Sequence, residues 1–274
     1  MKTIDTLIED IYALLDNGKE EPTQEYIDHL AKDIATNIAT SVIDYAKPRE
    51  GKLRMSNVGR PCNRQLWYEG NGEAGEPIDA PTKIKFMYGH VIEAILLYLA
   101  KEAGHTVTHE QEEIEIQGIK GHMDAVIDGV VIDVKSASKW AFDNKFKAGD
   151  LGDDSFGYIP QISGYAKALN CNEAAFLAMN KVSGELALMK VPELADIDAI
   201  IQHTKHEVDG EVLPPRGFND QPDGKSGNRA LHQVCSYCAF KKSCYPNLRA
   251  YQYYNGIKYL TKVVNPPKVP EVKA

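Results

Sequence analysis

The stretch GHMDAVIDGVVIDVKSAS, residues 121–138, carries two aspartates and a lysine within apolar sequence that is typical of strands. The pair Asp128-Gly129 between the two apolar runs predicts a two-residue hairpin turn. Counting from such a turn, Asp124 lies directly across from Asp133, with Cβ atoms roughly 4.5–5.5 Å apart. Two carboxylates this close repel each other and are costly when partly buried. The hairpin therefore needs something that neutralises them.

A divalent cation between Asp124 and Asp133 would turn this repulsion into a binding site. Mg²⁺ and Mn²⁺ prefer carboxylate, carbonyl and water oxygens as ligands, and an ion held this way can activate a water and stabilise charge on a phosphate. Lys135 follows Asp133 by two residues, so it projects from the same face of the strand. It could orient the water or neutralise the developing anion. On the hairpin alone, a surface turn with solvated charges explains these residues equally well.

Two predicted helices carry further polar groups. Residues 85–104, KFMYGHVIEAILLYLAKEAG, are apolar almost all round, which predicts a buried helix. His90 and Glu93 lie on one side of it, and ionisable groups in such a helix are rarely buried without a partner. A helix end that reaches solvent is the alternative. In YIPQISGYAKALN, Gln161 and Tyr165 are one turn apart and share a face, a pair that alone is typical of a surface or of a core tyrosine.

Taken together, these residues have a recognisable order along residues 85–170. The order resembles the RecB-like branch of the PD-(D/E)XK nucleases, and no position of the pattern is missing. The pattern consists of His90 with Glu93, Gly121-x-x-Asp124, Asp133-x-Lys135 and Gln161-x-x-x-Tyr165. The resemblance implies an α/β fold with a restriction-endonuclease-like core, in which helices flank a mixed central sheet.

The resemblance also implies a role for each residue of the pattern. Glu93, Asp124 and Asp133 would bind Mg²⁺ or Mn²⁺ together with the backbone carbonyl of Val134, and Lys135 would be the catalytic lysine. His90 matches a histidine that contacts metal or substrate in that family. Gln161 and Tyr165 would support the site and the nucleic-acid strand.

Five cysteines indicate a second site. Three of them form a C-x2-C-x5-C cluster, and a clustered, odd set in a cytosolic chain favours metal binding over disulfides. Cys62 is the best candidate for a fourth ligand, because Cys171 falls at a helix end; His232 ranks well below it. Four thiolates suit zinc and iron–sulfur clusters equally well, and buried thiols without metal are the remaining interpretation. The cluster consists of Cys235, Cys238 and Cys244.

One cysteine precedes the nuclease-like pattern and three clustered cysteines follow it. This arrangement is similar to that of the iron–sulfur nucleases related to the CRISPR-adaptation exonucleases and to that of AddB-type nuclease domains. This resemblance implies a [4Fe–4S] cluster on Cys62, Cys235, Cys238 and Cys244 that ties the two ends of the domain together. A structural Zn²⁺ is the alternative.

Basic and aromatic residues near these motifs suggest a path for DNA. Arg60 and Arg64 flank Cys62, and Lys139 precedes Trp140 shortly after the hairpin. Two further aromatic residues, Phe142 and Phe146, interleave with lysines in the same segment. Cationic grooves with aromatic platforms suit single strands. For each basic residue, a solvated charged face is the alternative.

The composition limits the class of protein. The chain has 274 residues, 43% of them hydrophobic and 26% charged, and a formal net charge of −8. These values are typical of a soluble globular protein, and the acidic balance lowers the expectation of nucleic-acid binding without excluding it. No apolar run is long enough for a membrane span, and early acidic residues argue against a signal peptide. We therefore expect a cytoplasmic protein, in the bacterial host if it is phage-encoded.

Three segments are expected along the chain: a helical N-terminal extension over 1–50, a nuclease domain over 51–264, and a flexible proline-rich tail over 265–274. Within the nuclease domain, residues 105–117 alternate and are predicted to form a strand. The expected function is a metal-dependent DNA exonuclease that acts on single strands or ends in recombination, replication or repair, in a phage or CRISPR-related setting. DNA and a protein from one of those processes are the expected partners. An endonuclease on the same core and a non-catalytic DNA-end-binding scaffold subunit are the alternatives.

Overall fold

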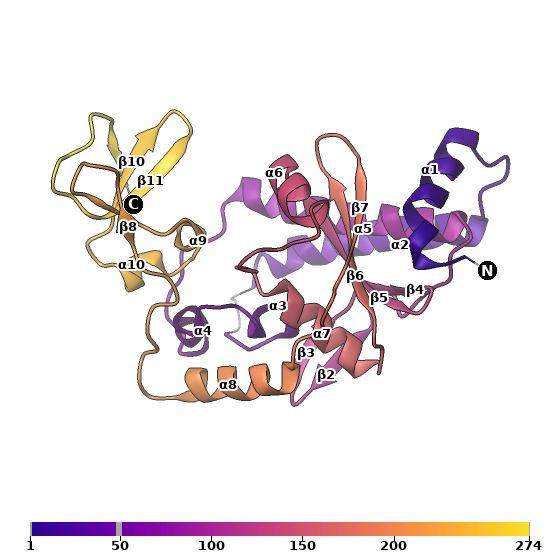
Figure 1. The fold of residues 1–274 in the computed structure, drawn as a ribbon, viewed down its shortest axis with the longest axis horizontal. Coiled ribbons are helices and arrows are strands. Elements are labelled where there is room, and N and C mark those ends of the chain that lie inside the picture. The colour runs from indigo at the N-terminus through magenta and orange to yellow at the C-terminus, as the bar shows by residue number, and fades with distance from the viewer. Residues whose placement is uncertain (1, 48–50, 274) are drawn as a thin grey trace. The chain divides into compact units, whose positions relative to one another are not determined.

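The computed structural model describes residues 2–47 and 51–273, and Figure 1 traces their elements from the N-terminus in indigo to the C-terminus in yellow. The chain forms two compact units. The first contains residues 2–47, 53–59 and 79–202, and the second contains residues 51–52, 60–78 and 203–273. Helix α8, Ile197–Asp209, begins in the first unit and ends in the second.

The first unit is built on a five-stranded mixed sheet with the order β1-β4-β5-β6-β7. Only the β5–β6 pair is parallel, and a separate hairpin is formed by β2 and β3. The strands are β1 Val107–Thr108, β2 Glu113–Ile116, β3 Ile119–His122, β4 Ala125–Ile127, β5 Val130–Ala137, β6 Ala174–Asn180 and β7 Leu186–Lys190. The predicted mixed α/β architecture with a mixed central sheet is confirmed.

The β4–β5 hairpin has the predicted register. Ile127 pairs with Val130 across a two-residue turn. Both turn residues have positive φ, 51° at Asp128 and 86° at Gly129. A tight turn of this kind requires that conformation, and Asp-Gly adopts it at low cost. The turn therefore sets which residues of the two strands face each other.

Helices cover both faces of the sheet. Buried residues of α1 and α5, such as Leu7 and Leu96, pack with Ile132 on one face. Buried residues of α3 and α7, such as Met55 and Tyr165, form the other core. The helical elements of this unit are η1 Ile4–Thr6, α1 Leu7–Asn17, α2 Gln24–Asp44, α3 Met55–Val58, α5 Ala80–Glu102, α6 Lys139–Ala141, the π-helical turn Phe142–Phe146 and α7 Tyr158–Ala168. The helical N-terminal segment predicted from the sequence is therefore present.

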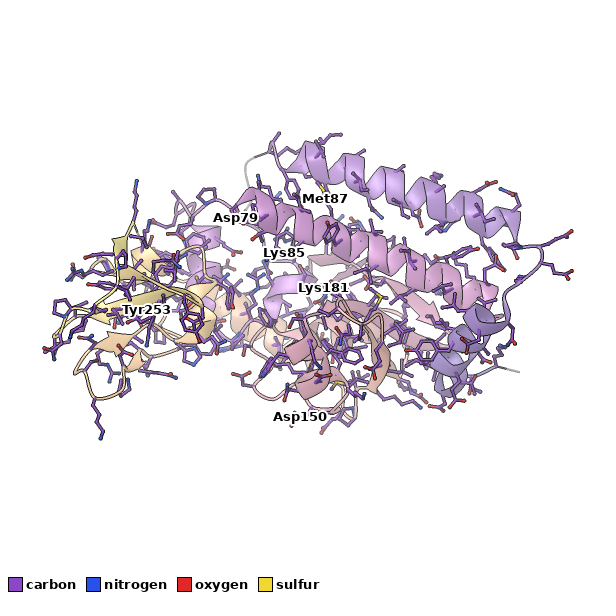
Figure 2. The ribbon with its side chains drawn as sticks, turned by 90° about the horizontal axis from the view of Figure 1, so that it is seen from above. Asp79, Lys85, Met87, Asp150, Lys181 and Tyr253 are labelled. Carbon is purple, nitrogen blue, oxygen red and sulfur yellow. The ribbon has the colours of Figure 1, made fainter. Side chains whose placement is uncertain are left out.

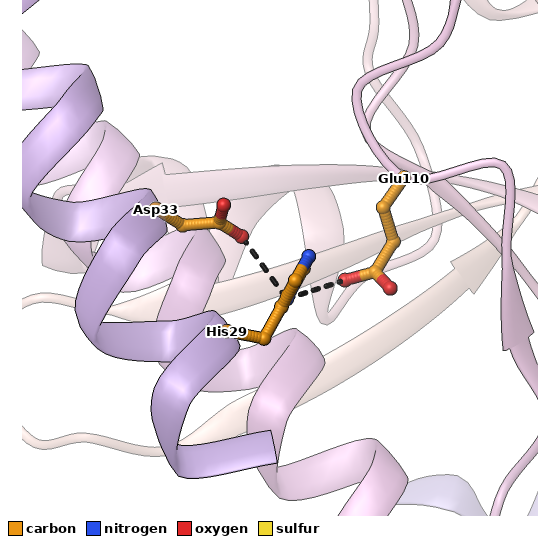
Figure 3. A group of neighbouring side chains, drawn as sticks. All are labelled: His29, Asp33 and Glu110. Carbon is orange, nitrogen blue, oxygen red and sulfur yellow. Dashed lines mark ion pairs between the residues drawn. The ribbon is translucent and has the colours of Figure 1, made fainter. Parts of the chain in front are cut away.

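Helix α2 lies alongside α5, as Figure 2 shows, although none of its residues is buried. Polar contacts join the two helices. Lys101 of α5 bonds to Glu110 at 2.7 Å and to the Nδ1 atom of His29 at 3.2 Å, and Asp33 lies beside His29 (Figure 3). Figure 3 draws the pairs of the His29 Nδ1 atom with Asp33, at 3.3 Å, and with Glu110, at 3.8 Å. His29 and Lys101 therefore link α2 and α5 through one group of polar contacts.

Two local predictions differ from the structure. Only the C-terminal part of α5, including Leu96, Leu97 and Ala100, is buried, whereas Phe86 and Tyr88 are exposed. The buried residues of α5 belong to the core that covers one face of the sheet, whereas its first turns contribute none to it. The strand predicted over 105–117 is divided into β1 and β2, because the chain between them turns through residues with positive φ.

The second unit contains a small antiparallel sheet, β12-β10-β11-β9-β8, which was not predicted. Its elements are α4 Asn63–Gly70, β8 Gln221–Pro222, β9 Arg229–Ala230, α9 Gln233–Ser236, α10 Lys241–Cys244, β10 Arg249–Tyr253, β11 Gly256–Lys262 and β12 Glu271–Val272. None of the described helices has the length and apolar character needed to cross a bilayer.

The tail expected to be flexible over 265–274 contains the short strand β12 within its described part, residues 265–273, and residue 274 lies outside the described residues. Val272 pairs with Ala250, and Glu271 forms an ion pair with Arg249. The prolines before them cannot donate backbone hydrogen bonds, but Glu271 and Val272 can. These two residues therefore add an edge strand to β10.

Candidate active site and cysteine pocket

The hairpin carries the two aspartates predicted to form a site. Asp133, in β5, is 1% exposed. Asp124 directly precedes β4, and its Oδ2 atom accepts a hydrogen bond of 2.6 Å from the backbone N–H of Val134. The pKa of Asp124 is raised to about 7, because the group is buried and lies close to the Asp133 carboxylate. The predicted repulsion between the two aspartates is therefore a feature of the folded protein.

Lys135 neutralises part of this charge. Its ammonium group contacts the Oδ2 atom of Asp133, a buried oxygen that accepts no hydrogen bond of good geometry. Burial alone would lower the pKa of Lys135, but the nearby Asp133, Tyr158 and Asp124 outweigh burial and raise it. Lys135 is therefore a fixed cation within the site.

Glu93 reaches the same group of charges from α5. It is half-buried, and the side-chain amide of Gln111 donates a hydrogen bond to it. Burial, followed by the charges of Asp124 and Asp133, raises the pKa of Glu93 to about 9. A carboxyl group in this state is protonated at neutral pH, so Glu93 binds a metal ion only after losing a proton.

Gln161 and Tyr165 lie together on α7, where the amide of Gln161 donates to the Tyr165 hydroxyl at 3.0 Å. Tyr165 is 1% exposed, and burial together with Asp133 raises its pKa, so the phenol stays protonated. A Cβ at Gly121 would lie 2.5 Å from the Cβ of Met55 and 3.0 Å from the Tyr165 ring. The glycine of the G-x-x-D pattern therefore leaves room for Tyr165.

The candidate carboxylates lie near one another, but their ligand atoms do not form a group as close as the one given next. Over residues 2–47 and 51–273, the only three His, Cys, Asp or Glu residues with ligand atoms all within 4.8 Å of one another are His29, Asp33 and Glu110. His90, one turn before Glu93, has an exposed side chain. In the structure described here, Lys135 is the positive charge at Asp133. The buried Oδ2 atom of Asp133, which accepts no hydrogen bond of good geometry, and the raised pKa values of Glu93 and Asp124 nevertheless suit a divalent ion.

Tyr158 belongs to the same site, although it was not among the predicted residues. The Lys135 ammonium lies over its ring, 4.6 Å from the centroid. Tyr158 precedes Gln161 by three residues, so helical periodicity already placed the two on one face. This spacing is the sequence signal that could have identified Tyr158 as a residue of the site. The contact with Lys135 depends on how α7 packs against β5.

The four predicted cysteine ligands line one pocket in the second unit. Cys62 comes from the turn before α4, and the others come from the segment that contains α9 and α10. Burial, then the neighbouring thiols, raises the pKa of Cys235 to about 12. Burial also raises the pKa of Cys238 to about 11. These side chains are therefore neutral thiols, and a bound cation would stabilise their thiolate forms, so the donor set fits a metal centre.

The other two candidate ligands lie elsewhere. Cys171, in the first unit, follows α7, and its Sγ atom lies 3.9 Å from the backbone carbonyl of Leu169. His232 stacks on Phe218 and accepts a hydrogen bond from the backbone N–H of Val234. Neither lines the cysteine pocket.

The basic residues predicted to bind DNA have partners within the protein. Arg64 donates to the backbone carbonyl of Pro214 at 2.6 Å and to the Cys244 sulfur at 4.0 Å. Arg60 pairs with Glu69 at 3.6 Å, and the exposed Lys139 pairs with a neighbouring aspartate. Arg64 is thus part of the cysteine pocket.

The aromatic residues predicted to interleave with the lysines separate into two groups. Phe142 and Phe146 are core residues, 0% and 5% exposed. Trp140 is 65% exposed. The π-helical turn directs the two phenylalanines inward, so they offer no platform for bases.

The sequence matches no family model and no curated protein. Similar solved structures include SSO0001, with a TM-score of 0.40 and 17% identity over 77% of this chain and 91% of that one. They also include an alkaline exonuclease, LHK-Exo, from Laribacter hongkongensis, with a TM-score of 0.40 and 19% identity over 59% of this chain and 86% of that one. Its complex with dAMP has a TM-score of 0.36 and 17% identity, over 58% and 85% of the two chains. These likenesses do not assign the chain to a family.

Proposed function

We propose that this protein is a metal-dependent deoxyribonuclease that hydrolyses phosphodiester bonds, as an exonuclease on single strands or DNA ends. The observation that carries the proposal is the convergence of Glu93, Asp124 and Lys135 on the buried Asp133 carboxylate, whose charge contributes to the shifted pKa values of the other three. Groups whose pKa values are shifted by burial and by specific charged neighbours cluster at functional sites.

Each residue has a role in this proposal. Glu93, Asp124 and Asp133 hold Mg²⁺ or Mn²⁺, with the Val134 carbonyl and His90 as further ligands. The bound ion supplies an activated water and neutralises charge on the phosphate. Lys135 donates hydrogen bonds to the water or to a phosphate oxygen, where negative charge develops. Gln161 and Tyr165 keep β5 and the entering strand in place.

The cysteine pocket supports a [4Fe–4S] cluster on Cys62, Cys235, Cys238 and Cys244. In such a cluster each cysteine sulfur binds a different iron. One Zn²⁺ held by the same four sulfurs is the alternative. We place the protein in DNA recombination, replication or repair, of a phage or beside CRISPR adaptation, with a partner protein from that process.

The test is cleavage of end-labelled single-stranded DNA by purified protein with Mg²⁺ or Mn²⁺. Asp133→Asn should lower the rate at least about 100-fold because a metal ligand is lost. Asp143→Asn, at an exposed aspartate paired with Lys139, is the matched control and should keep the rate. Circular dichroism should show that both variants are folded. Full activity of folded Asp133→Asn would contradict the proposed site.

A circular single strand distinguishes the alternatives. An exonuclease leaves it intact because it needs an end, whereas an endonuclease opens it. A scaffold subunit would protect DNA ends and cleave nothing in Mn²⁺.

A further inference from the structure

An aromatic stack leads from Lys135 to the solvent. The Lys135 ammonium lies 4.6 Å from the centroid of the Tyr158 ring. On Tyr158 lies Phe156, with ring centroids 5.5 Å apart and planes 19° apart. Phe156 is 50% exposed. The stack therefore connects the proposed catalytic lysine to an accessible aromatic ring.

The protein holds the Tyr158 end of this stack in place. Tyr158 packs against Phe146 and Phe176 of the core, with ring centroids 6.5 and 6.1 Å away. Asp154 caps the start of α7, because its carboxylate accepts hydrogen bonds from the backbone N–H groups of Tyr158, at 2.9 Å, and of the next residue, at 2.8 Å. Phe156 therefore stacks on a ring that is anchored in the core.

The backbone conformation of Gly157 allows the rings of Phe156 and Tyr158 to stack. Its φ of 75° is left-handed, and this conformation is favourable for glycine and costly for other residues. The turn reverses the chain between Phe156 and Tyr158, so that two rings separated by one residue lie face to face. In an extended chain they would project side by side.

We infer that Phe156 is a stacking platform for an unpaired nucleobase of the strand whose phosphate reaches Lys135. This inference rests on the proposed nuclease function and names the substrate of that site: DNA with at least one unpaired base. An aromatic face accepts any base, so stacking of this kind is tolerant of sequence. In the interior of a duplex, neighbouring base pairs cover both faces of each base. The terminal pair keeps one free face, but its bases are held in the pair, whereas an unpaired base can turn onto Phe156.

Three variants at this position test the stack. Phe156→Ala should raise KM for a single-stranded oligonucleotide about 5- to 150-fold, the loss expected for one stacked base, with little change in kcat. Phe156→Trp should retain the wild-type KM, because it keeps an aromatic face. Phe156→Leu keeps much of the volume without the π system and should behave like Phe156→Ala. The control is Tyr254→Ala, at a fully exposed aromatic residue in the second unit.

Binding without cleavage provides a second measurement. In an Asp133→Asn background, an oligonucleotide with 2-aminopurine near its end should lose fluorescence on binding, because the base stacks on Phe156. Adding Phe156→Ala should abolish this quenching. Wild-type quenching in that variant would overturn the inference. So would an unchanged KM in Phe156→Ala, a wild-type KM in Phe156→Leu, or an equal rise in KM on a blunt duplex. Absence of cleavage by the wild-type protein would instead contradict the nuclease proposal, and the quenching experiment would still test the stack.

Discussion

At the scale of single residues, the hairpin site buries acidic groups close together, where their charges repel more strongly than they would in water. Burial and mutual repulsion raise the pKa of Glu93 to about 9 and that of Asp124 to about 7, while Lys135 contacts Asp133. A divalent ion satisfies both acids only in their ionised form. Metal binding and proton release are therefore coupled at this site.

Mn²⁺ affinity should consequently depend on pH. Because Glu93 must ionise, the apparent affinity should rise with pH up to about pH 9, by up to about tenfold per pH unit for each proton released. In Glu93→Gln the rise should level off above about pH 7, where only the Asp124 titration remains. Electron paramagnetic resonance of free Mn²⁺ measures this. Glu112→Gln, at an exposed glutamate, is the control, and a flat wild-type profile between pH 7 and 9 would refute the coupling.

Lys135→Met separates catalysis from metal binding. The ammonium no longer competes for Asp133, so Mn²⁺ should bind at least as tightly as in the wild type. The cleavage rate at saturating metal should fall about 100- to 1,000-fold, because a hydrogen-bond donor to the developing charge is lost. Lys47→Met, at an exposed lysine paired with Asp44 after α2, should leave both quantities unchanged. Weaker metal binding with a normal saturated rate would show that Lys135 has another role.

At the scale of elements, the site depends on close packing of α3, β3 and α7. Met55 is fully buried, and Gly121 and Tyr165 are in contact range of one another around it. Met55 also lies against Gly164 of α7. This packing fixes the helix that carries Gln161 and Tyr165 against the strands that carry the aspartates.

Gly121→Ala should therefore destabilise the protein, although alanine is ordinarily better than glycine in a strand. The new methyl group would lie 2.5 Å from the Met55 Cβ, an atom that cannot move without the backbone of α3. We expect a loss of about 1–3 kcal/mol in the free energy of unfolding, as for other overpacked cores. Urea unfolding measures it. Gly89→Ala in α5, where the nearest side-chain atom is 4.0 Å away, is the control and should stabilise by about 0.5–1 kcal/mol.

At the scale of the whole molecule, the second unit is assembled from distant parts of the chain. Residues 60–78 and 203–273 belong to it, and the first unit is made largely from the residues between them. Cys62 comes from the earlier segment, and the other three pocket cysteines come from the later one. A centre bound to all four would link the two segments and restrain the unfolded chain.

Replacing Cys62 should thus affect more than the metal content. Cys62→Ser, purified without air, should lose iron and sulfide and become more susceptible to proteolysis within 60–78 and 203–273. Cys171→Ser is the control and should keep both the cluster and the protease resistance. Stoichiometric zinc without iron in the wild-type protein would replace the cluster with a zinc centre. Retention of iron in Cys62→Ser would contradict the ligand assignment.

The sequence by itself determined the local features of the site. The Asp128-Gly129 turn chemistry fixed the register that brings Asp124 to Asp133. Helical periodicity put Gln161 and Tyr165 on one face. These features depend on the backbone conformation of the turn and on the side-chain periods of a strand, two residues, and of a helix, about 3.6 residues. Residues close together in the sequence are enough to specify both. The β10–β11 hairpin turns instead at Tyr254-Asn255, so the neighbouring Asn255-Gly256 pair does not mark its two-residue turn.

Only the tertiary structure decided which side chains meet across the chain. Arg64 reaches Cys244, and Phe156 continues the stack that begins at Lys135. The same holds for Phe142, whose aromatic character suits a DNA platform and a core equally well until the π-helical turn directs it inward. Such contacts depend on how segments far apart in sequence pack together. That packing is set by the summed burial of many apolar groups, and no short sequence pattern encodes it.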